Sequence, residues 1–259
     1  MLPCSPCQRN SKSLHIRLSE RGVWYRIRGM NAQPRLSFTR PLVVGSVSDL
    51  AAWQAACAAE SLPCDVVELR ADGLPADTDW AALVQMRCCR PVLVTVRHAD
   101  EGGLRTMSTA ERVQIARSLL PLAASLDWEI AQLPEVPELV AEARAAGVPV
   151  IASAHDFEKT PALDSLLEKE QQARSLGATV AKFAFRLHRA EDMMTGVELL
   201  RRATGPTTAM GMGPLGAVSR LLYAQHGACL IYGYLGDTPT APGQWSAALC
   251  RQALDAIAG

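Results

Sequence analysis

Short apolar runs alternate with longer amphipathic stretches from residue 41 to the end of the chain. Eight of these runs predict strands, and they lack the strict alternation of apolar and polar residues that a strand with one solvated face shows. Parallel strands that are buried on both faces have this composition. The eight runs are Leu42–Val47, Val66–Arg70, Val92–Arg97, Leu126–Ala131, Pro149–Ser153, Thr179–Phe185, Thr207–Met210 and Cys229–Tyr232.

The stretches between the runs predict helices with recognisable ends. Ser108 and Glu111 have the spacing of a capping box. Thr160 and Pro161 predict an N-cap and a proline at the first position of a later helix. Gly147 closely follows another amphipathic stretch, where a glycine commonly ends a helix.

Strand and helix alternate eight times within about 220 residues. This order predicts an α/β protein with the closed (β/α)8 TIM-barrel architecture, in a single domain over residues 41–259. An open doubly wound sheet is the alternative, but no G-x-G-x-x-G fingerprint follows the first strand.

The first 40 residues differ from the rest in charge. The formal charges of the whole chain sum to zero, yet residues 1–40 carry eight basic side chains and one acidic one. Such an arm can bind nucleic acid or act as a transit peptide. We favour a disordered extension that arises from an upstream start, with Met30 as the alternative start, and we expect no nucleic-acid partner. No run of eighteen apolar residues is present, so we expect no membrane partner.

The eight cysteines give no clear metal or disulfide pattern. Cys4 and Cys7 form a C-x-x-C pair, but no second pair follows at the spacing of a zinc finger. The other six lie in apolar stretches, where a free cysteine behaves as a small hydrophobic residue. A reducing, cytoplasmic location fits this usage best.

Lys182 and His155 are the candidates for chemistry, since barrel active sites lie at the carboxyl ends of the strands. Lys182 lies within an apolar strand, where burial is costly for an ammonium and favours the neutral, nucleophilic amine. A structural lysine paired with a carboxylate explains that strand equally well. His155 follows the neighbouring strand and could reach the same cavity as a proton shuttle, although a lone loop histidine is more often a surface residue.

Several charged residues are expected at the same mouth of the barrel. A balanced polar cluster suits a small, anionic, polyhydroxylated substrate, with arginine for a carboxylate. Separate solvated ion pairs are the alternative, and these would stabilise the fold little. The cluster comprises Glu68, Arg70, Arg97, Glu101, Lys182 and Arg220.

From about Leu42 to its last residue, the chain resembles the type I 3-dehydroquinate dehydratases. The resemblance is carried by VVELRAD, LVTVRHADEGG, IASAHDFEKTP, TVAKFAF, MGMGPLGAVSRLL and TAPGQ, in the order and spacing of that family. It implies a lyase of the shikimate pathway that converts 3-dehydroquinate to 3-dehydroshikimate without a cofactor or metal. The implied catalytic residues are Lys182 as the Schiff base, His155 as proton donor and acceptor, and Glu101 to orient His155. A small-molecule substrate and a homodimer are also implied.

The resemblance further implies the residues that bind substrate. Arg220 would take the substrate carboxylate, and Thr240 would make a lid contact where the family usually has serine. The aromatic residue of the last strand is Tyr232 in this chain. The other implied contacts are Ser46, Glu68, Arg70, Arg97 and Gln244 for hydroxyls and pocket shape, and Met210 and Met212 for the apolar side.

Two alternatives to this function stay open. Another Schiff-base barrel, such as an aldolase acting on a sugar phosphate, would need a phosphate cradle near the last strands, which Gly211-Met212-Gly213 could mimic. The second is a degenerate barrel that only binds a ligand. The presence of both Lys182 and His155 argues against it.

Overall fold

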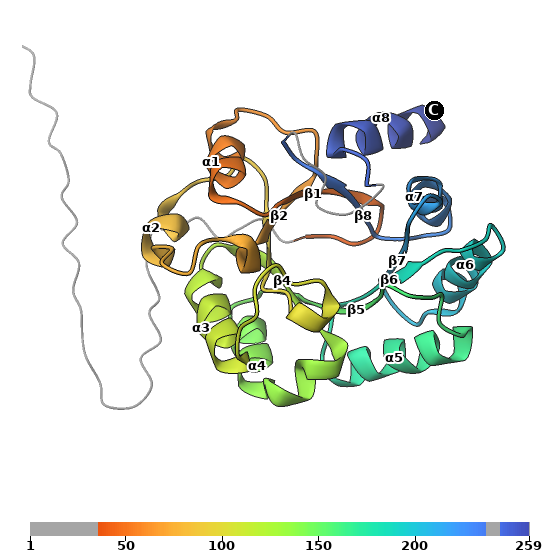
Figure 1. The fold of residues 1–259 in the computed structure, drawn as a ribbon, viewed down its shortest axis with the longest axis horizontal. Coiled ribbons are helices and arrows are strands. Elements are labelled where there is room, and N and C mark those ends of the chain that lie inside the picture. Colours follow the sequence, from red (N-terminus) through yellow and green to blue (C-terminus); the bar gives the residue numbers. More distant parts are fainter. Residues whose placement is uncertain (1–35, 237–243, 259) are drawn as a thin grey trace, which may run out of the picture. The chain divides into compact units, whose positions relative to one another are not determined.

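The computed structural model describes residues 36–236 and 244–258, in which strands alternate with helices (Figure 1). The predicted extension over residues 1–40, with Met30, lies outside the described residues as far as residue 35. The strands are β1 Leu42–Val47, β2 Val66–Arg70, β3 Val92–Thr95, β4 Ala123–Glu129, β5 Val150–Asp156, β6 Val180–Arg186, β7 Thr207–Met212 and β8 Leu230–Tyr234. The helices are α1 Leu50–Ala58, α2 Trp80–Gln85, α3 Thr109–Leu119, α4 Pro137–Ala145, α5 Leu163–Ser175, α6 Asp192–Arg202, α7 Gly216–Gln225 and α8 Ala247–Ala258.

All eight strands form one parallel sheet in the order β7-β6-β5-β4-β3-β2-β1-β8. The seam between β7 and β8 is bridged by a side chain, because Thr208 Oγ1 accepts from Leu230 N at 2.8 Å and donates to Leu230 O at 3.0 Å. Cys229 N donates to Thr207 O beside it. The predicted (β/α)8 barrel is confirmed in this nearly closed form.

Some local predictions hold and others fail. Ser108 and Glu111 form the predicted capping box of α3, and Gly147 has a positive φ of 73° after α4. The predicted cap at Thr160 and Pro161 is wrong, since α5 begins only at Leu163. Thr160 Oγ1 instead donates to the carbonyl of Arg186 at 2.6 Å, so a tertiary contact takes the hydroxyl that would have capped the helix.

Several predicted strand bounds also need correction. β3 ends two residues early, at Thr95, and β4 begins at Ala123 rather than Leu126. β5 continues to Asp156, so His155 lies on the strand and not after it. The pleat of β5 therefore fixes the direction of the histidine side chain.

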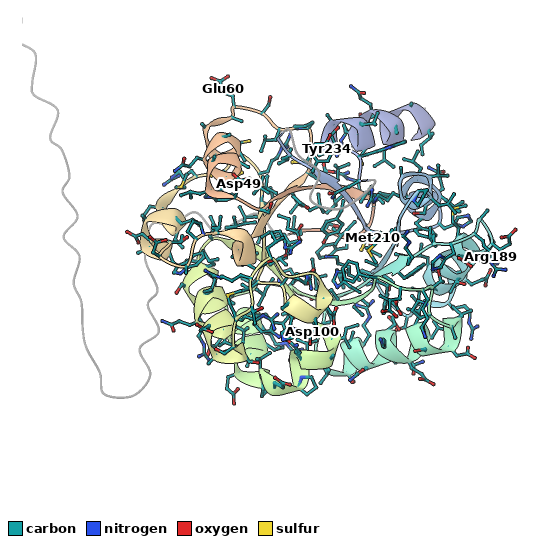
Figure 2. The ribbon with its side chains drawn as sticks, in the orientation of Figure 1. Asp49, Glu60, Asp100, Arg189, Met210 and Tyr234 are labelled. Atoms are coloured by element: carbon teal, nitrogen blue, oxygen red, sulfur yellow. The ribbon has the colours of Figure 1, made fainter. Side chains whose placement is uncertain are left out.

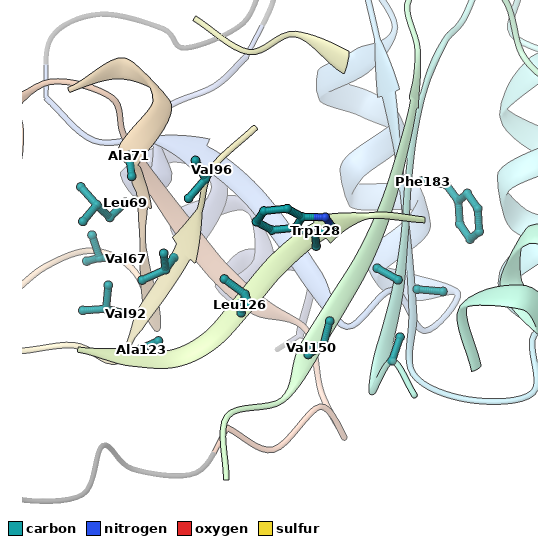
Figure 3. Close-up of a cluster of buried hydrophobic side chains, with 14 of the residues drawn as sticks. Val67, Leu69, Ala71, Val92, Val96, Ala123, Leu126, Trp128, Val150 and Phe183 are labelled. Atoms are coloured by element: carbon teal, nitrogen blue, oxygen red, sulfur yellow. The ribbon is translucent and has the colours of Figure 1, made fainter. Parts of the chain in front are cut away.

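Apolar side chains form two buried layers. The larger lies between the strands and the surrounding helices, and Figure 3 shows part of it around Trp128, Leu126 and Val67. The smaller inner cluster fills the barrel itself and includes Val44, Ile151, Val180 and Tyr232. Leu36 and Phe38 pack against the inner cluster, which is built mainly from the first halves of the strands. The carboxyl halves are left to polar side chains.

Arg112 of α3 is a fully buried arginine in the layer between helices and strands. Its Nη2 pairs with the Glu129 carboxylate and donates to Val96 O at 2.7 Å. Its guanidinium also lies over the Trp128 ring, 4.2 Å from the ring centre. Breaking a buried ion pair leaves an uncompensated charge, which is far costlier than breaking a surface pair.

We expect Arg112→Met to lower the free energy of unfolding by about 3 kcal/mol, because Glu129 loses one of its buried counter-charges. Arg117→Met, on the same helix, is the matched control. Arg117 pairs with Glu142 while 47% exposed, so its loss should cost less than about 1 kcal/mol. Urea unfolding of both variants measures the difference, and equal losses would contradict the expectation.

In the described part of the chain, none of the helices has the combination of length and hydropathy that crossing a membrane requires. The six cysteines in this part are all free.

Candidate active site

Lys182 lies near the middle of β6, and the pleat of the strand turns its side chain into the barrel. The side chain is 4% exposed, and Nζ donates to Asp127 Oδ2 of β4 at 2.9 Å. The same nitrogen lies 4.3 Å from the centre of the Tyr232 ring. A buried amine is thus paired and held in one position inside the barrel, whose carboxyl end is where barrel enzymes bind their ligands.

Asp127 is the centre of a buried hydrogen-bond network. Its Oδ1 accepts from Arg97 Nη2 at 2.8 Å and from Ser153 Oγ at 2.7 Å. Burial alone would raise the pKa of this carboxyl, but the charges of Arg97 and Lys182 hold the pKa well below its usual range. Asp127 therefore stays ionised and supplies a fixed negative charge beside Lys182.

Arg97 is held from several sides. Besides Asp127, its Nη1 donates to Glu129 Oε1 at 2.9 Å and to Ser153 Oγ at 2.6 Å. Burial disfavours the guanidinium charge, but Asp127 and Glu129 more than offset this, so the pKa of Arg97 is raised. Because Glu129 also pairs with Arg112, the carboxylate links the barrel interior to α3.

Glu68 lies in a second polar group on β1, β2 and β3. Its Oε2 accepts from Ser46 Oγ at 2.5 Å, and its Oε1 accepts from Thr95 Oγ1 at 2.8 Å. Glu68 is 4% exposed, and its carboxylate faces neutral hydroxyls only in these bonds. This arrangement leaves a second lone pair on each oxygen for a ligand hydroxyl.

Arg70 forms an ion pair with Asp72, a residue that the sequence analysis did not single out. Its Nε and Nη2 form a two-point pair with Asp72, at 2.9 and 2.7 Å, and Nη2 also donates to Gly102 O. Asp72 further accepts from the backbone N–H groups of Arg97 and Leu104. The carboxylate therefore ties the end of β2 to the segment that carries Glu101.

His155 and Glu101 are brought into direct contact. Glu101 Oε2 lies 2.8 Å from His155 Nδ1 and accepts from the His155 backbone N–H at 2.9 Å. Burial raises the pKa of Glu101 to about 7. Burial, followed by the charges of Arg97 and Lys182, lowers the pKa of His155 well below its usual value. With its pKa lowered in this way, the imidazole is neutral at neutral pH.

Arg220 of α7 is 5% exposed, and no residue of the described segments accepts a hydrogen bond from its Nε or Nη1. Burial lowers its pKa, which is the direction expected of an arginine without a carboxylate partner. No hydrogen bond joins it to the network around Lys182 among those residues. A buried guanidinium whose donors lack acceptors favours the binding of an anionic ligand.

The remaining predicted binding residues are only partly placed. Met210 belongs to the inner cluster and Met212 packs against it. Figure 2 shows Met210 within the ring of strands, whereas Glu60 and Arg189 lie at the periphery, outside the helices. Gln244 is buried. Thr240 lies outside the described residues.

The charged residues predicted at the barrel mouth bond mainly to other residues and not to one another. The ion pairs of Arg97 and Lys182, with Asp127 and Glu129, are buried, which excludes separate surface ion pairs for these two residues. Within residues 36–236 and 244–258, no group of three His, Cys, Asp or Glu side chains is arranged to hold a metal ion. What the site offers is an amine, a neutral imidazole and fixed charges, a set suited to carbonyl chemistry.

A family model described as Type I 3-dehydroquinase matches residues 41–259. The chain belongs to the type I 3-dehydroquinase family. Curated relatives include the 3-dehydroquinate dehydratase of Methanocella arvoryzae, 32% identical over 207 residues that cover 79% of this chain and 91% of the relative. That of Methanococcus maripaludis is 32% identical over 183 residues, covering 70% and 82%.

Solved structures agree with this membership. The 3-dehydroquinate dehydratase of Geobacillus kaustophilus superposes with a TM-score of 0.75 at 25% identity, covering 85% of this chain and 92% of that one. The enzyme of Enterococcus faecalis gives 0.72 at 25% identity, covering 85% and 95%. The barrel is thus the fold of the type I 3-dehydroquinases.

Asp127 and Asp72 are two site residues that the sequence analysis missed in this type I 3-dehydroquinase. Ser125, Asp127 and Glu129 alternate along β4, so the period of two that identifies inward-facing residues would have found Asp127. Asp72 follows β2 in a short 3-10 helix, where no such period applies.

Proposed function

We propose that this chain dehydrates 3-dehydroquinate to 3-dehydroshikimate through a Schiff base on Lys182. Dehydration of 3-dehydroquinate is the activity of the family, and the assignment of residues is our proposal. The observation that carries it is the buried Lys182 amine, held by Asp127 inside the barrel. A lysine amine there has no structural task that an apolar residue would not perform at lower desolvation cost.

The reaction begins when Lys182 transfers a proton to a neighbouring base and its free amine attacks the C3 ketone. Loss of the ketone oxygen as water leaves an iminium. His155 then removes the C2 proton, and the electron pair moves through C2–C3 onto the nitrogen. The enamine expels the C1 hydroxyl, which leaves as water with a proton returned by His155. Hydrolysis of the resulting iminium restores Lys182 and releases the product.

Glu101 would orient His155 for both proton transfers. A carboxylate that accepts from Nδ1–H keeps Nε2 as the basic atom, which sets the tautomer that a general base needs. Arg70 and Asp72 would hold the segment behind Glu101. Glu68, Ser46, Arg97, Gln244 and Thr240 would contact substrate hydroxyls and shape the pocket, with Met210 and Met212 on its apolar side.

We expect Glu101→Gln to lower turnover by about 10–100-fold, the usual effect of removing a carboxylate that orients a reacting histidine. In the unaltered chain, Glu101 gains a proton as the pH falls through about 7, because burial raises the pKa of Glu101 to about 7. Activity should fall below that pH. The variant has no carboxyl to titrate, so its acid limit should move to lower pH, where His155 alone titrates. A profile of kcat/KM against pH measures this, and an unmoved acid limit would contradict it.

Arg220 would bind the substrate carboxylate, since its buried guanidinium bonds no described residue through Nε and Nη1. We expect Arg220→Gln to raise KM by about 10–150-fold, because a hydrogen bond between charged groups contributes roughly 1.5–3 kcal/mol. Arg174→Gln is a control, because Arg174 lies on α5 and pairs with Glu170 of the same helix. Steady-state kinetics test this; an unchanged KM in Arg220→Gln would exclude the contact.

The test of the function is direct. The purified chain should convert 3-dehydroquinate to a product with the absorbance of a conjugated enone, without added metal or cofactor. Borohydride added during turnover should leave one reduced adduct, mapped by peptide mass to Lys182. Turnover without any adduct would refute the Schiff base, and absence of turnover would refute the function.

A cytoplasmic location and a homodimeric state also belong to the proposal. The six free cysteines of the described segments support a reducing compartment. The dimer rests on the resemblance to the family, and sedimentation velocity would test it.

A further inference from the structure

The aromatic ring of Tyr232 lies against the nitrogen that would carry the substrate. Tyr232 is on β8, where its backbone pairs with Val44 of β1, and its side chain is 4% exposed within the inner cluster. Lys182 Nζ lies over the ring, 4.3 Å from its centre. Because the same nitrogen donates to Asp127, one cation contacts both a carboxylate and an aromatic face.

We propose that Tyr232 is a positioning residue whose ring stabilises the positive charge on Lys182 in the ammonium and then in the iminium. The inference rests on the proposed function, since only the Schiff-base reaction converts the one cation into the other. It assigns to β8 a part in the reaction that goes beyond shaping the pocket.

The two groups around Nζ respond differently to the covalent step. An ammonium has three N–H donors, and the iminium formed from it keeps only one. Asp127 depends on that remaining N–H for its hydrogen bond. The attraction of a cation to a ring face depends on charge and distance and needs no N–H group, and it is strongest where water is excluded. The attraction of Tyr232 therefore persists in the iminium, in which the nitrogen has lost two of the three N–H donors that the ammonium had.

The ring matters most around the enamine. When the C2 proton leaves, the electron pair neutralises the nitrogen, and loss of the C1 hydroxyl as water restores the iminium. The charge thus disappears and returns at one atom while the ring stays in place. A ring beside the nitrogen favours the charged iminium over the neutral enamine before and after elimination, so removing the ring should lower the amount of iminium present.

The ring rather than the hydroxyl of Tyr232 carries this role. The phenol oxygen is buried and has no hydrogen-bond partner among the described residues. Burial, with the nearby charges of Glu68 and Asp127, raises the pKa of the phenol well above its usual value, so it stays neutral. Arg97 is the nearby cation, and it opposes that shift. The hydroxyl can be removed without changing the charges around Lys182.

The experiment compares Tyr232→Phe, which keeps the ring, with Tyr232→Met, which replaces the ring by a flexible apolar chain. Each variant is mixed with 3-dehydroquinate and a limiting concentration of borohydride, and the rate of adduct formation is followed by intact mass. We expect a fall of about 30-fold in Tyr232→Met, the size of a desolvated cation–π contact. Tyr232→Phe should trap at close to the rate of the unaltered chain. Circular dichroism and thermal melting check that both variants fold.

The outcomes separate this inference from the proposed function. If the unaltered chain gives no adduct at Lys182, the proposed function fails. If it gives the adduct and a folded Tyr232→Met traps equally fast, only the role of the ring fails. If Tyr232→Met does not fold, Tyr232→Phe still decides: a large loss of trapping there would assign the effect to the hydroxyl and overturn the proposal.

Discussion

Replacing Lys182 by Met should lower kcat by about 10⁶-fold, the size of effect seen when a covalent nucleophile is removed from an enzyme. Methionine keeps the apolar volume of the lysine chain but has no amine, so no iminium can form. Without that electron sink, the C2 proton has no acidifying cation beside it. Turnover of 3-dehydroquinate, followed by the absorbance of the product, measures the loss.

The same variant should show no borohydride adduct. Lys159→Met is the matched control, because Lys159 lies on the exposed segment after β5 and its side chain enters none of the contacts around Lys182. That control should keep full activity and full trapping. Asp127 loses a counter-charge in Lys182→Met. The stability of this variant should therefore be compared with that of the unaltered chain by urea unfolding before the kinetics are interpreted. Turnover near the unaltered rate in a folded Lys182→Met would end the Schiff-base assignment.

His155→Ala should lower kcat by roughly 10²–10⁴-fold, the range for removal of a general acid–base group. The imidazole is neutral because burial and the charges of Arg97 and Lys182 lower its pKa, so it is ready to accept a proton. Its removal leaves Lys182 and Asp127 in place. The iminium should still form, and borohydride should still trap an adduct, at a reduced rate.

His188→Ala serves as the control for loss of an imidazole. His188 follows β6 and contacts the carbonyl of Glu158 through Nε2, away from the Lys182 network. It should turn over normally. His155→Ala with unchanged turnover, or with trapping abolished altogether, would show that His155 does not act mainly at the C2 and C1 steps.

The sequence was most informative where a polar residue interrupts a regular apolar pattern. The barrel and the burial of Lys182 were predictable because buried parallel strands have a distinctive composition, and an amine within one is conspicuous. Asp127 follows the same rule, since it lies within the predicted strand Leu126–Ala131, but its carboxylate was not singled out.

Features that depend on tertiary contacts were not predictable in the same way. Thr160 has the local chemistry of an N-cap, yet its hydroxyl bonds Arg186 on another segment. Arg70 was correctly placed at the end of β2, but nothing local shows that Asp72 takes its guanidinium. Arg220 likewise depends on packing, since the whole fold decides that no described residue accepts a hydrogen bond from its Nε or Nη1.

The Thr208 bridge makes the contact between β7 and β8 the weakest contact between neighbouring strands of the barrel. Elsewhere neighbouring strands are joined by backbone ladders, whereas β7 and β8 meet largely through a hydroxyl. A closed sheet opens most easily between the strands that share the fewest hydrogen bonds. Regions of low local stability are those that open locally in proteins, and elements that bind ligands are drawn from them. The barrel would then widen between β7 and β8 when a ligand enters or leaves. The charged residues of the site, on β2 to β6, would keep their positions.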